Sequence, residues 1–497
     1  MEPQHHSNSL SRLHARLVAA GVLLAGIVAA WHYSAIGLAL SHYDARAHVV
    51  VARRVFDSLM PGWQQIGAVW LPLPHVLNML PVQIDAFYRS GASAIAISVA
   101  SMAVGAWALA SLLVRTTGSA SAAVTAGVLL MWNPNTLYLQ STPMTEPLLF
   151  GTCLLAVNLT AGWIEEGARD TRAAGWAIVA ACMTRYEAWP FTAALVALAF
   201  IVLLRRGMAA RDAAWACARL AAYPAIAVLL FVLNSRWTTG NWFLTGGFYV
   251  AENEALGRPW LAWEQIREGM YLLSGPYTVR LGYAGAMALV AGFVIARTRA
   301  TLALTLALAA FATLPLYAYV QGHPFRIRYS VALVVAAAVI TASAVSLVPR
   351  RLRALTAAAA ALAAALQTAP FDRSAPMIVE AQRDAANMRG RTAVTQYLEE
   401  HYDDRLIMMS MGSLAHYMHD LSKSGFRIRE ILHEGIGDVW AAAFEYGPHG
   451  HVGWIAIEEK AEGGDALFHR AGENPQWLRG FARVAEGGGV ALYRATP

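Results

Sequence analysis

The sequence predicts an α-helical polytopic membrane protein that carries a small soluble α/β domain at its C-terminal end. Of its 497 residues, 57% are hydrophobic and 14% are charged, and the mean hydropathy is +0.42. A soluble globular protein carries roughly 25% charged residues. The low charge content therefore indicates a membrane protein before any segment is considered.

Apolar runs long enough to cross a bilayer recur along the first 370 residues. The hydrocarbon core of a membrane takes about 20 apolar residues per helix. We therefore predict about eleven transmembrane helices and expect the first to be retained rather than cleaved as a signal peptide. They are expected near residues 17–40, 92–114, 120–139, 146–163, 173–186, 189–204, 214–233, 281–296, 301–319, 331–348 and 353–369.

Arginines in the short loops predict the orientation, because cytoplasmic loops carry an excess of Lys and Arg. We expect a bacterial inner-membrane protein with a cytoplasmic N-terminus, surrounded by membrane lipid, and with the longer loops and the C-terminal domain outside. The arginines expected on the cytoplasmic side are Arg12, Arg16, Arg115, Arg169, Arg172, Arg205, Arg206, Arg211, Arg297, Arg299, Arg350, Arg351 and Arg353.

The membrane domain is expected to span residues 1–370, with two long external loops at 41–91 and 237–280. Within the first loop, residues 44–60 place apolar side chains on one helical face and charged ones on the other. This pattern predicts an amphipathic helix that lies in the membrane interface. The second loop mixes aromatic residues, glycines and acids.

The composition changes after Pro370, and residues 371–497 hold most of the acids and both lysines. Short β-rich runs are expected at 405–411, 452–457, 482–485 and 490–494, and helices at 391–401 and 437–446. The size is ordinary for a single domain. We therefore predict a small external α/β domain.

The basic residues exclude one class of partner. They are almost all arginines scattered through loops and form no basic run, which argues against nucleic acid. The planar guanidinium suits phosphate or carboxylate recognition. Cys153, Cys182 and Cys217 lie in or beside apolar spans and form neither a metal set nor a disulfide framework.

Several charged residues are predicted at membrane depth, where such groups are costly and usually face a cavity. Arg185 lies about 20 Å along a helix from Arg172, which we place at the cytoplasmic boundary. Arg185 and Glu187 form either a pair that joins two helices or a wall of an outward-facing cavity. Glu146, in STPMTEPLLF, either interacts with the dipole of the helix that it begins or binds substrate at the external mouth.

The segment QGHPFRIRYS places His323, Arg326 and Arg328 at the external end of a predicted span. Two arginines so close together are a poor membrane anchor on this side, and they could clamp a phosphate through bidentate, charge-assisted hydrogen bonds. The alternative is that Arg326 pairs with an acid of the second long loop.

Asp44 follows the first span directly and begins the first external loop. Ser41-x-x-Asp44 resembles a capping box, in which the acid binds a free amide at a helix start. His48 lies one turn further on the same face. The position of Asp44 after an outward-going span, together with His48, Arg53 and a Trp- and Pro-rich segment, favours a catalytic role over the cap.

Four segments together resemble the class C (GT-C) glycosyltransferases, and within them the bacterial membrane proteins related to protein O-mannosyltransferases and aminoarabinose transferases. These segments are YDARAHVVVARRVFDSLMPGWQQIGAVWLPLPHVL, STPMTEPLLF, TRYEAWPF and HPFRIRY. The resemblance covers most of residues 20–335 in layout. In the family a second acid often stands beside the catalytic one, whereas Ala45 follows Asp44 here, which leaves a divalent metal ion open.

The resemblance implies inverting transfer of a sugar from a polyprenyl-phosphate donor to a hydroxyl of a glycan, lipid or protein at the outer face of the membrane. Asp44 takes the position of the family's catalytic acid, where it would accept the acceptor's proton. Arg326 and Arg328 would neutralise the departing phosphate. The residues expected to line the sugar pocket are Trp70, His75, Tyr186 and Tyr329.

Two other classes of function remain open. A transporter or flippase of a lipid-linked sugar would use the same cavity and arginines without a base, although the paired halves with broken helices typical of transporters are not found. A non-catalytic envelope assembly protein would work through the C-terminal domain, whose histidines show no metal-site spacing.

Overall fold

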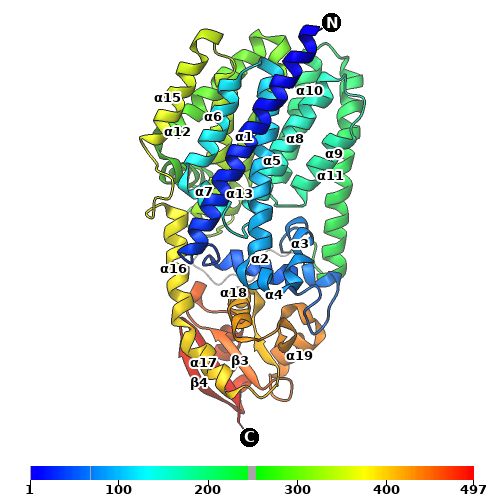
Figure 1. The fold of residues 1–497 in the computed structure, drawn as a ribbon. Helices are drawn as coiled ribbons and strands as arrows, with labels where there is room; N and C mark the ends of the chain where they lie inside the picture. The colour runs from blue at the N-terminus through cyan, green and yellow to red at the C-terminus, as the bar shows by residue number, and fades with distance from the viewer. Residues whose placement is uncertain (1, 68, 244–252, 497) are drawn as a thin grey trace.

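A helical bundle and a small sheet domain lie one above the other in the computed structural model, which describes residues 2–67, 69–243 and 253–496. The N-terminus lies at the far end of the bundle and the C-terminus at the far end of the sheet domain (Figure 1). Helix α2 (Tyr43–Arg53) lies between the two parts. The predicted fold class, a polytopic helical membrane protein with a C-terminal α/β domain, is confirmed.

Within the described residues, eight helical segments are long and apolar enough to cross a membrane. They are α1 (Glu2–Ala35) from Arg12 onward, α5 (Ala92–Thr117), α8 (Glu146–Glu165), α10 (Ala188–Arg205), α11 (Ala210–Thr239), α12 (Pro259–Ile295), η3 (Arg297–Ala312) with α13 (Thr313–Val320), and η4 (Ile327–Ser330) with α14 (Val331–Val345). The shorter helices are α3 (Leu73–Asn78), α4 (Asp85–Ser90), α6 (Ala120–Trp132), α7 (Pro134–Leu139), α9 (Arg172–Cys182) and α15 (Arg353–Ala365), besides the 3-10 turn η1 (Trp63–Ile66).

Three of the eleven predicted spans correspond to short helices. The predicted span 120–139 is divided at Asn133-Pro134 into α6 and α7, because proline cannot donate the amide that a continuous helix needs. Helices α9 and α15 have 11 and 13 residues, which at 1.5 Å per residue is less than the roughly 30 Å of a bilayer core. The count of eleven therefore stays a prediction.

The arginines predicted to be cytoplasmic join loops at the end of the bundle far from the sheet domain. Arg115 forms an ion pair with Glu165 at 2.7 Å. Arg353 donates to the carbonyl of Thr117 at 3.1 Å. These two contacts connect the end of α5 to α8 and to the start of α15.

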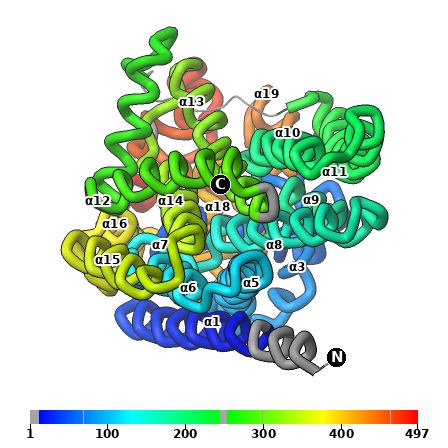
Figure 2. Tube along the Cα trace, turned by 90° about the horizontal axis from the view of Figure 1, so that it is seen from above, coloured from blue at the N-terminus to red at the C-terminus, as the bar shows by residue number. Residues whose placement is uncertain are grey.

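Helix α14 is the central helix of the bundle. It is buried along almost its whole length, as a sequence made almost entirely of small and β-branched residues permits. Figure 2 shows it in the middle, with α12, α6 and α15 around it. Because η4 leads into α14, any side chain at 327–330 is delivered to the end of the bundle that faces the sheet domain.

The soluble domain contains one five-stranded sheet in the order β2-β1-β3-β5-β4. Strand β1 runs parallel to β2 and β3, and β5 runs antiparallel to β3 and β4. The strands are β1 (Ile407–Met409), β2 (Ile431–Leu432), β3 (Trp454–Glu458), β4 (Phe481–Gly487) and β5 (Val490–Ala495). The helices are α16 (Pro376–Gly390), which still packs on the bundle, α17 (Thr392–His401), α18 (Met411–Leu421), α19 (Asp438–Tyr446) and α20 (Ala466–Glu473). Four strands were predicted, and the two-residue β2 was not.

The predicted interfacial helix at 44–60 is wrong in length and in environment. Helix α2 ends at Arg53, and residues 44–52 are buried on all sides. The charged face that was expected to meet water meets the soluble domain instead, because that domain packs directly beneath the helix (Figure 1).

The second predicted loop, 237–280, is helical at both ends. Helix α11 continues to Thr239, and α12 begins at Pro259 and bends at Gly275, whose φ of 76° interrupts the helix before Pro276. The part of this loop at 244–252 lies outside the described residues.

Candidate active site

The Asp44 carboxylate meets an arginine of the bundle. Its Oδ2 lies 2.5 Å from Nη1 of Arg328, which η4 carries at the start of the central helix. The capping-box interpretation does not hold: the N-cap of α2 is His42, whose Nδ1 accepts the Asp44 N–H at 3.2 Å. The hydroxyl of Ser41 donates to the carbonyl of Leu38. The Asp44 side chain therefore does not cap helix α2.

Glu146 lies between two arginines. Its Oε1 is 3.3 Å from Nε of Arg328 and 3.2 Å from Nη1 of Arg185. Arg185 in turn pairs with Glu187 at 2.8 Å and donates to the hydroxyl of Thr145 at 2.9 Å. The cluster thus consists of three carboxylates and two guanidinium groups, brought together from α2, α8, the α9–α10 connection and η4.

The cluster is buried, which strengthens its electrostatics. Burial raises the pKa of the Asp44 carboxyl, but Arg328, together with His42 and His48, outweighs this and lowers that pKa to about 2. Both oxygens of Glu146 are buried and accept no hydrogen bond from the described part of the chain. Its Oε1 lies in the two ion pairs described above, whereas a buried acceptor such as Oε2 is costly without a donor, so Oε2 is well placed to accept a hydrogen bond from a ligand hydroxyl.

Next to Asp44 lies a group of three rings in contact, of which Trp70 and His75 are stacked and His48 is tilted against both. His48 is one helical turn beyond Asp44, and its Nδ1 is 3.2 Å from Nε2 of His75. The Trp70 ring lies 4.1 Å from the His48 ring and 6.0 Å from the His75 ring, centroid to centroid. Burial lowers the pKa of His48 to about 3 and that of His75 well below its usual value. Both imidazoles are therefore neutral near pH 7, and they offer hydrogen bonds and flat surfaces rather than charge.

Arg53 does not join this cluster. Its guanidinium pairs with Asp57 and Asp85 at 3.3 and 2.8 Å and donates to the carbonyl of Val82 at 2.7 Å. It also lies over the ring of Tyr88. These contacts connect the end of α2 to the 82–88 segment, which is a structural role.

The two arginines of QGHPFRIRYS have different surroundings. Arg328 makes the ion pairs described above, whereas the backbone carbonyl of Arg326 accepts the hydroxyl of Tyr319 at 2.9 Å. The rings of His323 and Tyr329 lie 5.7 Å apart. Tyr329 follows Arg328 in the chain, and His323 lies against the Tyr329 ring.

An apolar cavity of about 380 Å³ lies beside the cluster, between the 63–72 segment and α11. Its wall includes Met183, two residues before Arg185, and Phe231, whose ring lies 6.3 Å from that of Tyr186. Trp63 and Asn234 close one side through a hydrogen bond of 3.2 Å. The remaining lining residues are Ile66, Gly67, Pro72, Ala227 and Leu230.

Sequence reasoning missed two contributors to the site. His42, the N-cap of α2, gives no spacing signal that separates it from the other histidines of this region. Asp420 of the soluble domain pairs with Arg46 of α2 across 374 residues of chain, and no local pattern reports such a contact. Within the described residues, no group of three or more His, Cys, Asp and Glu side chains is arranged to hold a metal ion.

Comparisons with known proteins extend the description of the fold. No protein-family model matches the chain, and no curated protein does. Among solved structures, the chain is similar to the crystal structure of ArnT from Cupriavidus metallidurans bound to undecaprenyl phosphate. The similarity covers 96% of this chain and 97% of that one, with a TM-score of 0.57 and 10% sequence identity. The fold is the GT-C fold. The resemblance stated from four sequence segments is thus confirmed in its fold, over both the bundle and the soluble domain.

Proposed function

We propose that the protein is a membrane glycosyltransferase, which transfers a sugar from a polyprenyl-phosphate donor to a hydroxyl group at the outer face of the cytoplasmic membrane. One observation supports this proposal above the others. Asp44 and Glu146 form buried ion pairs with Arg328 and Arg185 at one end of the bundle. The ArnT structure of similar fold holds undecaprenyl phosphate. A lipid phosphate is a ligand that such arginines and a neighbouring apolar cavity suit.

The donor would bind through its phosphate and through its lipid tail, which need different surroundings. Arg328 and Arg185 offer planar forks that match phosphate oxygens. The apolar cavity bounded by Met183 and Phe231 would hold the first isoprene units of the lipid. Its place beside Arg185 agrees with a phosphate whose tail leaves toward α11.

The reaction follows from the charges of the site. In the resting protein Asp44 is paired with Arg328 and is a weak base, with a pKa of about 2. A donor phosphate that engages Arg328 would weaken this pair, and burial would then raise the pKa of Asp44. Asp44 takes the proton of the acceptor hydroxyl while the acceptor oxygen bonds to the anomeric carbon. The bond from that carbon to the phosphate oxygen breaks, the phosphate leaves with the electron pair, and the anomeric carbon is inverted.

The sugar would lie between Glu146 and the rings of Trp70 and Tyr329. Glu146 accepts a hydrogen bond from a sugar hydroxyl, which gives its Oε2 a donor. Neutral His48 and His75 form a flat wall behind Asp44. In this arrangement the acceptor, which is a glycan, lipid or protein, enters from outside, and the N-terminus is cytoplasmic.

The test is Asp44→Asn in the purified full-length protein, with Asp212→Asn as control, because Asp212 is exposed at the start of α11. Transfer from a polyprenyl-phosphate sugar is measured by mass spectrometry, and donor binding is measured separately. We expect Asp44→Asn to bind donor within about threefold of the parent and to lose 10²–10⁴ in turnover, the usual value of a general base. Turnover at the parental rate would show that Asp44 is not the base.

A further inference from the structure

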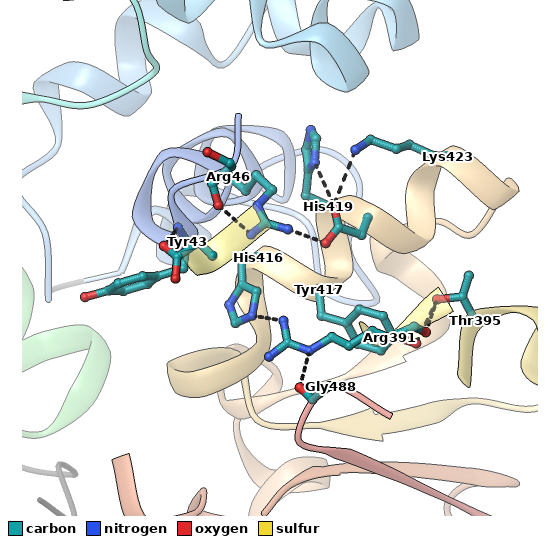
Figure 3. A network of polar contacts seen from close by, with 12 residues as sticks. Tyr43, Arg46, Arg391, Thr395, His416, Tyr417, His419, Lys423 and Gly488 are labelled. Atoms are coloured by element: carbon teal, nitrogen blue, oxygen red, sulfur yellow. Dashed lines mark hydrogen bonds and ion pairs between the residues drawn. The ribbon is translucent and has the colours of Figure 1, made fainter. Parts of the chain in front are cut away.

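Helix α2 presents charged residues to both parts of the molecule. Asp44 faces Arg328 of the bundle. Arg46, two residues later, is turned by about 200° around the helix and faces the soluble domain. Its Nη1 forms an ion pair with Asp420 of α18, and its Nη2 donates to the carbonyl of Ser41 at 2.9 Å (Figure 3). One guanidinium therefore joins the soluble domain to the turn that begins the Asp44 helix.

The apolar residues of α2 are divided in the same way. Ala45 packs in the core of the bundle. Val49 and Val50 pack in the core of the soluble domain, together with Met409 and Leu414. The soluble domain thus forms part of the support of α2, and its removal would expose one whole side of that helix.

Helix α18, which carries Asp420, is itself firmly held. Arg391 donates to the carbonyl of Gly488 at 3.2 Å and bonds to His416 of α18 (Figure 3). It also pairs with Glu458 at 2.9 Å. These contacts connect α18 to β3 and to the turn between β4 and β5. Asp420 is therefore presented to Arg46 from a rigid element, as precise positioning requires.

A second contact crosses the interface at the other end of α2. Arg429 of the soluble domain pairs with Asp57 at 2.8 Å, and the Arg429 side chain is 53% exposed. Arg46, in contrast, is 1% exposed. An exposed ion pair is screened by water and contributes little, whereas a buried one is sensitive to the loss of either partner. Arg429 is therefore a matched control for Asp420.

We propose that Asp420 is a positioning residue for sugar transfer: through Arg46 it holds the first turn of α2, and so it holds Asp44 where Arg328 and the substrate meet it. This inference rests on the proposed function. It makes the soluble domain a working part of the site rather than a separate module. A misplacement of about 1 Å in a catalytic group can lower a rate about 10²-fold, so loosening of this turn is expected to reduce turnover more than donor binding.

The kinetic test uses full-length protein and a polyprenyl-phosphate sugar. Asp420→Asn is expected to lower kcat about 10²-fold with KM for the donor within about threefold, and Asp420→Glu to restore kcat to within about tenfold of the parent. Arg429→Gln is expected to stay within about twofold. A parental kcat in Asp420→Asn, or an equal loss in Arg429→Gln, would overturn the proposal.

A double variant separates positioning from folding. Arg46→Met with Asp420→Leu removes both charges together, and such hydrophobic replacements of buried ion pairs usually keep a protein folded. It is expected to melt near the parental temperature and to keep the low kcat, because it lacks the connection to Ser41. A parental kcat in this variant would refute the role of the ion pair.

Hydrogen exchange gives a readout that does not depend on transfer. In Asp420→Asn, amides of residues 41–53 are expected to exchange at least about tenfold faster, while α8 and α14 keep their protection. Unchanged exchange at 41–53 would overturn the proposal. If the parent transfers no sugar but this loosening is found, the proposed function fails and the positioning of α2 by Asp420 stands.

Discussion

Replacement of Arg328 by glutamine would change the acidity of Asp44. The substitution removes the guanidinium that lies 2.5 Å from the Asp44 carboxylate. In the native protein, burial raises the pKa of Asp44, and Arg328 with His42 and His48 more than compensates, which leaves a pKa of about 2. Without Arg328, burial is no longer outweighed, and the pKa of Asp44 is expected to rise above its ordinary value of 3.8.

The size of this rise follows from the burial of the pair, whose side chains are 13% and 12% exposed. Removal of one partner of a buried ion pair costs roughly 3–5 kcal/mol, and one pKa unit corresponds to about 1.4 kcal/mol. The pKa of Asp44 should therefore rise by about 2–4 units, to between about 4 and 6. Because the ionised carboxylate is the active base, activity is lost as the pH falls through this value.

The assay is the pH profile of kcat/KM, which reports ionisations of the free enzyme. The parent is expected to show no acid limb down to about pH 4, and Arg328→Gln to show one between about pH 4 and 6. Arg328→Gln should also lose about 10² in kcat, because it lacks the guanidinium that donates hydrogen bonds to the phosphate. Arg267→Gln, which removes an exposed pair on α12, should keep the parental profile. If Arg328→Gln retains full kcat/KM at pH 4, Arg328 does not control the ionisation of Asp44, and the reasoning is refuted.

Three further predictions concern stability. Arg185→Met removes the shared partner of two buried carboxylates, so it should lower the free energy of unfolding by roughly 3–5 kcal/mol in denaturant titrations; an unchanged midpoint would contradict a buried network. Gly151→Ala places a Cβ 2.3 Å from the carbonyl oxygen of Ser101, where α5 and α8 touch, whereas Gly162→Ala in the same helix meets its nearest atom at 4.0 Å. The first should lower Tm, by about 1–3 kcal/mol in stability, and the second should leave Tm equal or slightly higher; equal melting of the two variants would count against this helix contact. Burial raises the pKa of Asp465 from 3.8 to about 7, so the folded domain keeps a proton that the unfolded chain has lost, and stability falls as the pH rises from about 4 to 7. Asp465→Asn should flatten this part of the Tm-against-pH curve, by up to about 4 kcal/mol at pH 8, and a curve that keeps the parental slope would show that Asp465 does not cause it.

The sequence alone determined the class of the protein and much of its layout. Its composition predicted a membrane bundle, and the change of composition after Pro370 predicted a soluble α/β domain, because both properties are sums over many residues. Glu146 and Arg185 were selected as charges that lipid would not tolerate, and they lie together in the structure. Asp44 was selected as the candidate catalytic base because it directly follows the first predicted span.

The tertiary structure decided which charges meet. It placed Arg328 in ion pairs with both Asp44 and Glu146. It also covered the charged face of α2 with the soluble domain, where the sequence pattern predicted water. A helical pattern reports one face relative to another within a few turns, but it does not report what covers each face. The pairing of Arg46 with Asp420, 374 residues later, depends on how two domains pack, and only the folded chain brings these charges together.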